Sequence, residues 1–376
     1  MKKIFILTGE PSGDKLASKA ISELKNLKSD IKYLCVGGEY LKALGINSLY
    51  NLNEVTYLGF TKVILNIFKI KTKINKTVNK IIEYNPDILF SVDSPDFTLR
   101  VAKKVKKLKP NIKTIHFVAP KVYVWRENRV KKLKLFLDHV LLLFPFEKKY
   151  FDKENINSTF VGHPLLDSSK ESSISLPSLI NNEKKIISIF PGSRISEIKI
   201  LMPILIKFIN LTQNNYENFS YKFHSTKELE NSLKEFLLNS SIKDYEIISE
   251  ENTKKDILSK TFFAIAKSGT ISLEICNAGV PSIIIYKMNF INFFIIKLLV
   301  KIRYANIFNI VANSEIIPEL LQSKCNHNKI YEIFNLYMRD PDIRKNQVLK
   351  CNKILESMKI DVPSSKKIAD ILLKEI

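Results

Sequence analysis

The chain has 376 residues and a formal net charge of +21; 45% of its residues are hydrophobic and 26% are charged, as in a globular protein of about two domains. Its four scattered cysteines form no CxxC pair, which argues against a zinc site or disulfide framework and indicates a reducing cytoplasm. A strand begins within three residues of the N-terminus, and the longest uncharged part of region 283–302 is too short for a bilayer, so neither a signal peptide nor a membrane span is expected.

Apolar runs alternate with helical stretches along the chain. In the first half the predicted strands are Ile4–Leu7, Tyr33–Val36, Ile88–Val92, Thr114–Val118, Val140–Leu143 and Thr159–Val161. After a polar linker over 167–185, strands are predicted at Ile186–Phe190, Ser220–Phe223, Glu246–Ile248, Phe262–Ala266 and Ser282–Ile285, and the chain is predicted to be helical from about Glu315. This alternation predicts an α/β fold of two Rossmann-like domains with parallel sheets, covering 1–168 and 169–345. Helices over 346–376 are expected to pack back on the first domain.

The stretch Gly9–Asp14 follows the first predicted strand and leads into a helix predicted to start near Lys15. A glycine turn at a helix N-terminus is typical of a phosphate site. However, the carboxylates of Glu10 and Asp14 would repel phosphate. The turn, with its hydroxyl at Ser12, is therefore predicted to face a neutral, hydroxyl-bearing substrate, and the nucleotide is predicted to bind elsewhere.

Two acids follow the predicted strand Ile88–Val92. Asp93 is expected to project from the strand end into an interdomain cleft, where it is our candidate general base for deprotonating an attacking hydroxyl. Asp96 follows Pro95 and suits a helix N-cap on the acceptor side. The spacing of the two acids is not the Asp-x-Asp metal signature, so no metal is predicted, and a metal shared by the two acids is a minor alternative. The alternative is that both acids only cap the turn.

Two further strand ends carry candidates for the acceptor side. Trp125 and Arg126 lie in an aromatic and cationic stretch that suits the wall of a lipid or sugar site. An equally weighted alternative is a core tryptophan with surface cations. His163, in the segment that closes the first domain, either reaches the cleft or hydrogen-bonds within the hinge.

The second half contains two turns suited to an anionic nucleotide. In the first, Gly192 allows close approach of the backbone, Ser193 can cap a helix, and Arg194 offers a fork to a diphosphate. In the second, Ser268, Gly269 and Thr270 precede a helix, with Glu274 one turn later to accept from ribose hydroxyls. The alternative for each turn is ordinary helix capping.

Basic residues are concentrated in the first half. Six lysines and no acid lie between Thr61 and Ile82, and thirteen basic residues with one acid lie between Arg100 and Lys134. This density indicates an anionic membrane, nucleic acid or phosphorylated substrate, against the alternative of a solvated face. The predicted helix over 58–82 has a core face at Val63, Ile67, Ile70, Ile74, Val78 and Ile81. A second apolar patch at Phe60, Ile64, Leu65 and Phe68 is a candidate membrane contact, or the second side of a buried helix.

Taken together and in this order, the motifs resemble those of the lipid-A-disaccharide synthase family, glycosyltransferases of Gram-negative outer-membrane lipid synthesis. The motifs are Gly9–Asp14, Val36–Gly38, Leu58-Gly59, Asp93–Phe97, Val124–Arg126, Leu143–Glu147, Val161–Pro164, Pro191–Arg194 and Ser268–Thr270 with Glu274. The resemblance covers nearly the whole chain. It implies a GT-B-like fold and inverting transfer of a diacylated glucosamine from a UDP donor to the 6-hydroxyl of diacylglucosamine 1-phosphate, releasing UDP. It also implies peripheral binding at the cytoplasmic face of the inner membrane.

The resemblance implies functional roles for Glu10, Asp93, Arg194 and Asn309, the last preceded here by Phe308 where the family commonly has proline. We expect Asp93 to take the acceptor's proton, Glu10 to orient acceptor hydroxyls or serve as the base instead, and UDP to leave without a cofactor or metal. The Ser268–Thr270 turn would support the leaving UDP.

Three other functions are alternatives to this one. A UDP-sugar epimerase of similar fold would share the nucleotide turns and release a rearranged UDP-sugar without an acceptor. A nicotinamide oxidoreductase would need a G-x-G-x-x-G turn, which is absent, and a nucleic-acid binder would need a module that the sequence does not contain. No nucleic-acid partner is therefore expected, and a homodimer is left open.

Overall fold

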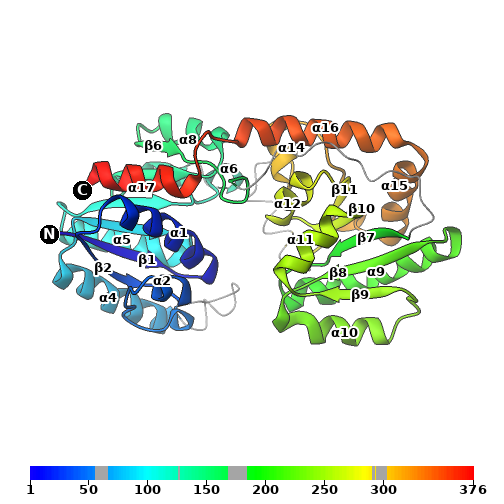
Figure 1. The fold of residues 1–376 in the computed structure, drawn as a ribbon, viewed down its shortest axis with the longest axis horizontal. Helices are drawn as coiled ribbons and strands as arrows, with labels where there is room; N and C mark the ends of the chain where they lie inside the picture. Colours follow the sequence, from blue (N-terminus) through cyan, green and yellow to red (C-terminus); the bar gives the residue numbers. More distant parts are fainter. Residues whose placement is uncertain (56–66, 126–127, 168–183, 290–292, 294–302) are drawn as a thin grey trace. The chain divides into compact units, whose positions relative to one another are not determined.

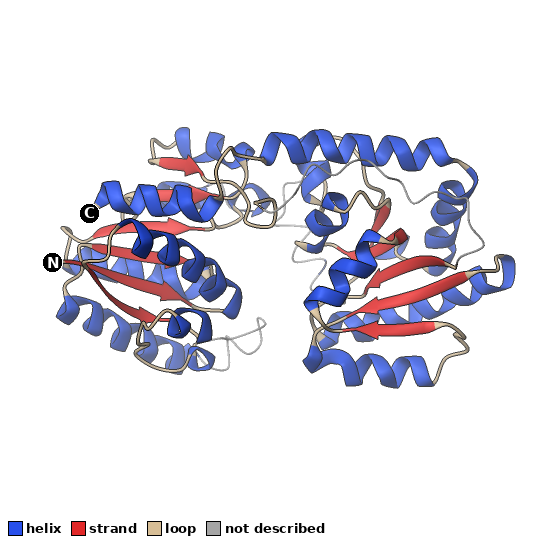
Figure 2. Cartoon of the chain, viewed as in Figure 1, coloured by secondary structure: helices blue, strands red, loops and turns tan. Residues whose placement is uncertain are grey.

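A computed structural model describes residues 1–55, 67–125, 128–167, 184–289, 293 and 303–376. The chain divides into two compact units, Met1–Asp167 with Met358–Ile376, and Ser168–Ser357. In each unit a sheet of parallel strands is covered by helices (Figures 1 and 2). The two sheets and the helices between their strands confirm the predicted α/β class.

The first unit contains a six-stranded parallel sheet in the order β2-β1-β3-β4-β5-β6. Its strands are β1 (Lys2–Thr8), β2 (Ile31–Val36), β3 (Ile88–Val92), β4 (Lys113–Phe117), β5 (His139–Leu142) and β6 (Ser158–Phe160). Its helices are α1 (Pro11–Leu27), α2 (Glu39–Ala43), α4 (Ile67–Tyr84), α5 (Pro95–Leu108), α6 (Val122–Trp125), α7 (Asn128–Leu133), α8 (Lys148–Asp152) and, from the C-terminus, α17 (Ser364–Glu375). Each predicted strand of this half is present, with ends within two residues of those predicted.

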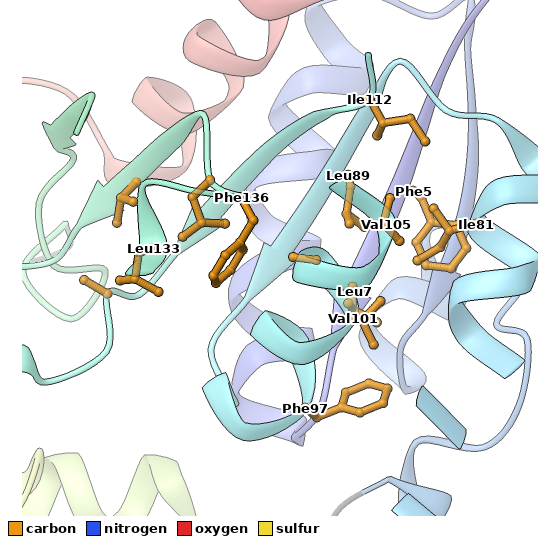
Figure 3. Close-up of a cluster of buried hydrophobic side chains, with 14 of the residues drawn as sticks. Phe5, Leu7, Ile81, Leu89, Phe97, Val101, Val105, Ile112, Leu133 and Phe136 are labelled. Carbon is orange, nitrogen blue, oxygen red and sulfur yellow. The ribbon is translucent and has the colours of Figure 1, made fainter. Parts of the chain in front are cut away.

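Alternate residues of the first sheet point to opposite hydrophobic clusters. On one face, Phe5 and Leu7 of β1 and Leu89 of β3 pack with buried side chains of α4, α5 and α7, among them Ile81 and Val101 (Figure 3). On the other face, side chains of the same strands, among them Ile4, Ile6 and Phe90, pack with the two helices α1 and α17. Ala20 of α1 and Leu372 of α17 belong to this cluster. Burial of both faces explains why the central strands read as continuous apolar runs in the sequence.

The second unit contains another six-stranded parallel sheet, in the order β12-β11-β10-β7-β8-β9. Its strands are β7 (Lys185–Phe190), β8 (Phe219–His224), β9 (Tyr245–Ile248), β10 (Thr261–Lys267), β11 (Ser282–Tyr286) and β12 (Glu319–Leu321). Its helices are α9 (Ile195–Asn215), α10 (Glu230–Leu238), α11 (Glu251–Ser259), α12 (Ile271–Asn277), α14 (Ile307–Ala312), α15 (His327–Arg339) and α16 (Pro341–Met358). A core of buried side chains joins α9, α10 and α15 to the sheet.

The strand β12 corrects the prediction that the chain is helical from about Glu315. It has three residues and pairs in parallel with β11, so that Leu320 lies opposite Ile285. A strand this short has too few residues to show an alternating pattern. Its pairing partner is more than thirty positions earlier in the sequence, so only the tertiary structure identifies it.

The return of the chain to the first unit begins at Met358, later than the predicted residue 346. Within the second unit, the Gln347 side chain of α16 bonds both backbone groups of Ser282, at 2.7 and 3.0 Å. Beyond α16, the Asp167 carboxylate holds the first residue of α17: the backbone N–H and the hydroxyl of Ser364 donate to its two oxygens at 3.0 and 2.6 Å. Helix α17 then packs against α1.

Candidate active site

The order of strands in each sheet identifies the place where a ligand is expected. In a doubly wound sheet, ligands bind at the carboxyl ends of the two neighbouring strands where the chain order reverses. In the first sheet these strands are β1 and β3, which pair in register from Ile4 with Ile88 to Thr8 with Val92. In the second they are β7 and β10, with Phe190 beside Ala266. We call these strand ends the first and second switch points.

The first switch point brings the Gly9–Asp14 stretch against the turn that follows β3. A Cβ added to Gly9 would lie 2.6 Å from the Cβ of Ser94, so only glycine fits there. A Cβ added to Gly13 would lie 3.6 Å from the Cβ of Asp93. Glu10 and Asp93, separated by more than eighty residues in the sequence, therefore belong to adjacent turns.

The backbone of Asp93 is held from both sides. Its N–H donates to the carbonyl of Phe117 on β4 at 3.0 Å, and its carbonyl accepts from the Thr98 hydroxyl of α5 at 2.6 Å. The residue is partly exposed. A fixed backbone with a partly exposed carboxylate is the arrangement expected of a positioned base.

Unusual backbone conformations cluster beside this carboxylate. Asp93 and Ser94 have φ values of 53° and 46°, and Val118, at the end of neighbouring β4, has a φ of 71°. The left-handed region is especially unfavourable for a β-branched valine. Residues held this way commonly lie at functional sites, where the surrounding structure fixes them.

Glu10 and Ser12 lie at the start of α1, which begins at Pro11 and not near Lys15 as predicted. Glu10 is the N-cap residue, with extended backbone and a partly buried position. Ser12 lies in the first turn of the helix and is exposed. Both remain candidates for the acceptor side.

Asp14 corrects the prediction that both acids of the turn face a substrate. Its side chain is buried, and its two oxygens accept from the backbone N–H groups of Gly38 and Tyr40 at 2.8 and 2.9 Å. It thereby caps the start of α2. The Val36–Gly38 motif and the Gly9–Asp14 motif are thus two halves of one structural contact.

Asp96 is not the N-cap of α5 as predicted. The N-cap is Ser94, whose carbonyl accepts from the N–H groups of Phe97 and Thr98, while Asp96 lies exposed in the first helical turn. The described part of the chain contains no group of three or more His, Cys, Asp or Glu side chains arranged to hold a metal ion.

The predicted acceptor wall is only partly described. Trp125 ends α6, but its side chain lies outside the description, as does Arg126 altogether. The nearby Tyr123 is buried, with its ring 5.0 Å from that of Phe146. The structure does not place His163 in an open site: it is buried, its Nδ1 accepts from the Leu165 N–H at 3.3 Å, and burial lowers its pKa to about 4.

Sequence reasoning did not assign the role of Glu147. This buried carboxylate accepts from the N–H of Phe144 at 3.1 Å, and burial raises its pKa to about 8. The bond closes the turn of the Leu143–Glu147 motif. Glu147 lies three residues after Phe144, the spacing of a capping box, and this spacing is the sequence signal for its capping role.

At the second switch point, α9 begins at Ile195 and its N-cap is Arg194, so Ser193 is not the cap that the sequence predicted. Ser193 and Arg194 are exposed. The N–H of Ser193 donates to Oε2 of Glu197 at 3.0 Å, and an ion pair of 2.9 Å joins Oε1 of the same carboxylate to Lys267. Glu197 therefore connects the ends of β7 and β10.

The second nucleotide turn follows β10. The Ser268 hydroxyl donates to the carbonyl of Ala305 at 3.0 Å, while Gly269 and Thr270 are exposed, with Thr270 as N-cap of the seven-residue α12. Glu274 forms an ion pair of 2.7 Å with Lys254 of α11. The two predicted nucleotide turns are thus at neighbouring strand ends of one sheet.

Asn309 is fully buried in α14, and its side-chain amide is saturated within the chain. It donates to the carbonyl of Ile317 and to Glu319 at 2.7 and 2.8 Å, and accepts from the N–H groups of Ile316 and Ile317 at 2.8 and 2.9 Å. All four of its hydrogen-bonding positions are used. In this structure Asn309 holds the 305–319 segment together rather than presenting its side chain to a ligand.

Glu319, which the sequence reasoning missed, is the second member of this buried group. Its carboxylate also accepts from the N–H groups of Ala305 and Asn306, each at 2.8 Å, and burial raises its pKa. Because Ala305 also accepts from Ser268, the buried group supports the turn after β10.

Among the described helices, none is both long enough and apolar enough to cross a membrane. The sequence is 36% identical over 363 residues to the lipid-A-disaccharide synthase of Rickettsia prowazekii, covering 95% of this chain and 94% of that protein. Among solved structures, UDP-GlcNAc 2-epimerase of Neisseria meningitidis matches with a TM-score of 0.66 at 16% identity, over the full length of both chains. The glycosyltransferase of kitacinnamycin matches with a TM-score of 0.64 at 11% identity, covering 100% of this chain and 99% of that one.

The two solved structures are too distant in sequence to indicate more than a shared fold, which confirms the expected GT-B-like architecture. The epimerase alternative has only this likeness of fold in its support. By contrast, residues 4–372 match the family described as Lipid-A-disaccharide synthetase. Together with the curated relative, this match shows that the chain belongs to the lipid-A-disaccharide synthase family of glycosyltransferases.

Proposed function

We propose that this glycosyltransferase transfers 2,3-diacylglucosamine from its UDP conjugate to the 6-hydroxyl of 2,3-diacylglucosamine 1-phosphate. The products would be lipid A disaccharide 1-phosphate, with inverted configuration at the transferred anomeric carbon, and UDP. Membership of the family supports the reaction class. The observation that carries the assignment of residues is the first switch point, where the turns bearing Glu10 and Asp93 lie against each other.

The reaction is a single displacement. The bond from the acceptor O6 to the donor C1 forms as the bond from C1 to the diphosphate oxygen breaks, and the hydroxyl proton passes to Asp93. Glu10 orients acceptor hydroxyls beside it, with Ser12 as a further hydrogen-bonding group. If Asp93 only supports the site, Glu10 is the base, and kinetics of the two single variants separate these roles.

The second unit binds the donor. Arg194 neutralises charge on the leaving diphosphate, the Ser193 and Ser268–Thr270 turns supply hydrogen-bond donors, and Glu274 accepts from ribose hydroxyls. Glu274 forms an ion pair with Lys254, so ribose binding would compete with that ion pair. Asn309 contributes by holding the segment that supports Ser268.

The test is incubation with both proposed substrates, followed by mass detection of the disaccharide and NMR assignment of the new glycosidic bond. We expect one disaccharide and one UDP per turnover, undiminished by a metal chelator. Omission of the acceptor distinguishes the epimerase: release of a rearranged UDP-sugar without acceptor would reject the transferase assignment.

We also propose that the first unit binds an anionic membrane surface, at the cytoplasmic face of the inner membrane. Helices α4 and α5 pack together, with Lys104 donating to Asn75 at 2.6 Å, and they present further exposed lysines. These are Lys71, Lys76, Lys80, Lys103 and Lys107. The predicted apolar contact at Phe60, Ile64 and Leu65 lies outside the described residues, as does the side chain of Phe68.

Sedimentation with phosphatidylglycerol vesicles tests this surface. Replacing Lys103 and Lys107 by Glu should weaken binding because each lysine near an anionic bilayer contributes about 1 kcal/mol. The matched control replaces the exposed Lys207 and Lys345 of the second unit by Glu. Equal loss in both double variants would show dependence on net charge alone and would contradict a specific surface.

A further inference from the structure

We propose that Lys267 is a second cation for the donor diphosphate, and that Glu197 occupies this anion site until the diphosphate displaces it. The inference rests on the proposed donor site of the second unit and adds to it a binding residue and a competing internal anion. The evidence for it is the set of contacts made by the Glu197 carboxylate.

Glu197 lies in the first turn of α9, a helix of 21 residues, and its side chain is only 14% exposed. The carboxylate contacts three groups of the kind that bind phosphate. The N–H of Ser193 donates to it at 3.0 Å, Lys267 lies 2.9 Å away, and Arg194 lies 3.8 Å away. A backbone N–H before a helix, a lysine and an arginine form an anion site, and here the anion is part of the chain.

The backbone at Gly192 is adapted to this carboxylate. Gly192 has a φ of 123°, and a Cβ there would lie 2.5 Å from Oε2 and 2.8 Å from Cβ of Glu197. The glycine is therefore required by the close approach of Glu197 as well as by its own conformation. The Pro191–Arg194 motif and Glu197 form one structural group.

Lys267 reaches the site from the other strand of the switch point. It is the last residue of β10, whose Ala266 lies beside Phe190 of β7. Its ammonium lies 5.2 Å from the centre of the Tyr286 ring, and its side chain is 19% exposed. The ring and Glu197 hold the ammonium beside the turn that precedes α9, where Arg194 also lies.

The geometry indicates an exchange of anions. Arg194 is 58% exposed and lies as far as 3.8 Å from the carboxylate, so this ion pair is loose. A diphosphate carries more charge than a carboxylate and has more acceptor oxygens for the same three donors. Glu197 would reduce the repulsion between the two cations, and would compete with the incoming UDP.

A purely structural role for Glu197 and Lys267 makes a different prediction. In that case Glu197 only fixes the turn. Neutralising it would then weaken the binding of UDP and of uridine alike, or of neither. An exchange predicts effects of opposite sign: loss of Lys267 weakens binding of the diphosphate, and loss of the Glu197 charge strengthens it. Uridine, which lacks phosphate, should respond to neither substitution.

The experiment is calorimetric titration of the full-length protein with UDP and with uridine. For Lys267→Met we expect the Kd for UDP to rise about tenfold, which corresponds to about 1.4 kcal/mol, with the Kd for uridine unchanged. Lys267→Arg should recover much of the affinity. For Glu197→Gln, which keeps an oxygen for the Ser193 N–H, the Kd for UDP should fall roughly threefold to tenfold. The control Lys207→Met removes an exposed lysine of the same helix α9.

The outcomes separate this inference from the proposed function. Failure of the unmodified protein to bind UDP would reject the donor site itself. If the unmodified protein binds UDP and Lys267→Met binds it equally well, Lys267 is not a diphosphate ligand. Unchanged or weaker binding of UDP by Glu197→Gln would overturn the competition. If Lys267→Met does not fold, Lys267→Gln, which also removes the charge, takes its place in the comparison.

Discussion

The two switch points are built alike but carry opposite charge. In the first unit the turns after β1 and β3, which carry Glu10 and Asp93, lie against each other. In the second, the turns after β7 and β10 place Arg194 and Lys267 around a single internal carboxylate. The fold fixes where a ligand binds in each sheet, and the residues at the strand ends decide its charge. Under the proposed function, one fold would serve a neutral sugar hydroxyl in one unit and a diphosphate in the other.

The largest expected effect concerns the first switch point. Asp93→Asn should lower the rate of transfer by about 10²- to 10⁴-fold, because the acceptor hydroxyl loses its general base. Binding of UDP by the second unit should stay within about twofold if the units bind their substrates separately. Steady-state kinetics together with UDP titration measure both quantities.

The matched control for that variant is Asp96→Asn, which removes an exposed acid three residues away. Near-normal transfer by Asp93→Asn, or an equal loss in Asp96→Asn, would contradict the assignment of the base. A loss confined to Glu10→Gln would transfer the role to Glu10.

The corresponding change at the second switch point is Arg194→Met. Loss of charge-assisted hydrogen bonds of about 1.5–3 kcal/mol should weaken UDP binding by roughly tenfold to a hundredfold. Arg339→Met, an exposed arginine at the end of α15, is the control. If Arg194→Met keeps its affinity for UDP but loses activity, Arg194 acts on the acceptor side, and the contrast in charge between the two switch points does not correspond to their ligands.

Asp14 separates architecture from chemistry within the first switch point. Asp14→Asn should lower the free energy of unfolding by about 2–3 kcal/mol, because an amide cannot accept equally from the N–H groups of Gly38 and Tyr40. Urea denaturation measures the change, with the exposed Asp30→Asn as control. Unchanged stability with lost acceptor binding would return Asp14 to the substrate site.

The smallest expected effect is a pH dependence beside β3. His116 is buried against the Ser91 hydroxyl at 2.8 Å, and burial lowers its pKa to about 4 from an ordinary value of 6.5. The unfolded chain therefore binds a proton first, and stability falls as the pH decreases from about 6.5 towards 4.

Between pH 7 and pH 5, His116→Gln should lose about 1–2 kcal/mol less stability than the unmodified protein in urea titrations. His327→Gln, at the partly exposed start of α15, controls for removal of a histidine. An identical pH dependence in His116→Gln and the unmodified protein would show that His116 does not cause the acid sensitivity.

Much of the fold was predictable from local pattern. The buried central strands are continuous apolar runs ended by glycine or acidic turns, so eleven strands and the class of the fold follow from the sequence. The missed strand β12 has three residues and depends on β11 for its existence. Helix α1 starts at Pro11, earlier than the predicted Lys15. The N-cap of α9 is Arg194 and not the predicted Ser193, because backbone conformation and not residue type alone decides the cap.

The sequence by itself determined the repeating strands and helices and the charge carried by each strand-end turn, because both depend on residue types close together in the chain. Only the tertiary structure decided which of those residues face outward. Asp14 and Asn309 have the residue types of a binding site, yet their side chains are taken up by backbone groups of Gly38 and Ile317. Conversely, Glu197 and Lys267 meet only because β7 and β10 are neighbours in the sheet. Such pairings depend on contacts between distant segments, which local sequence does not encode.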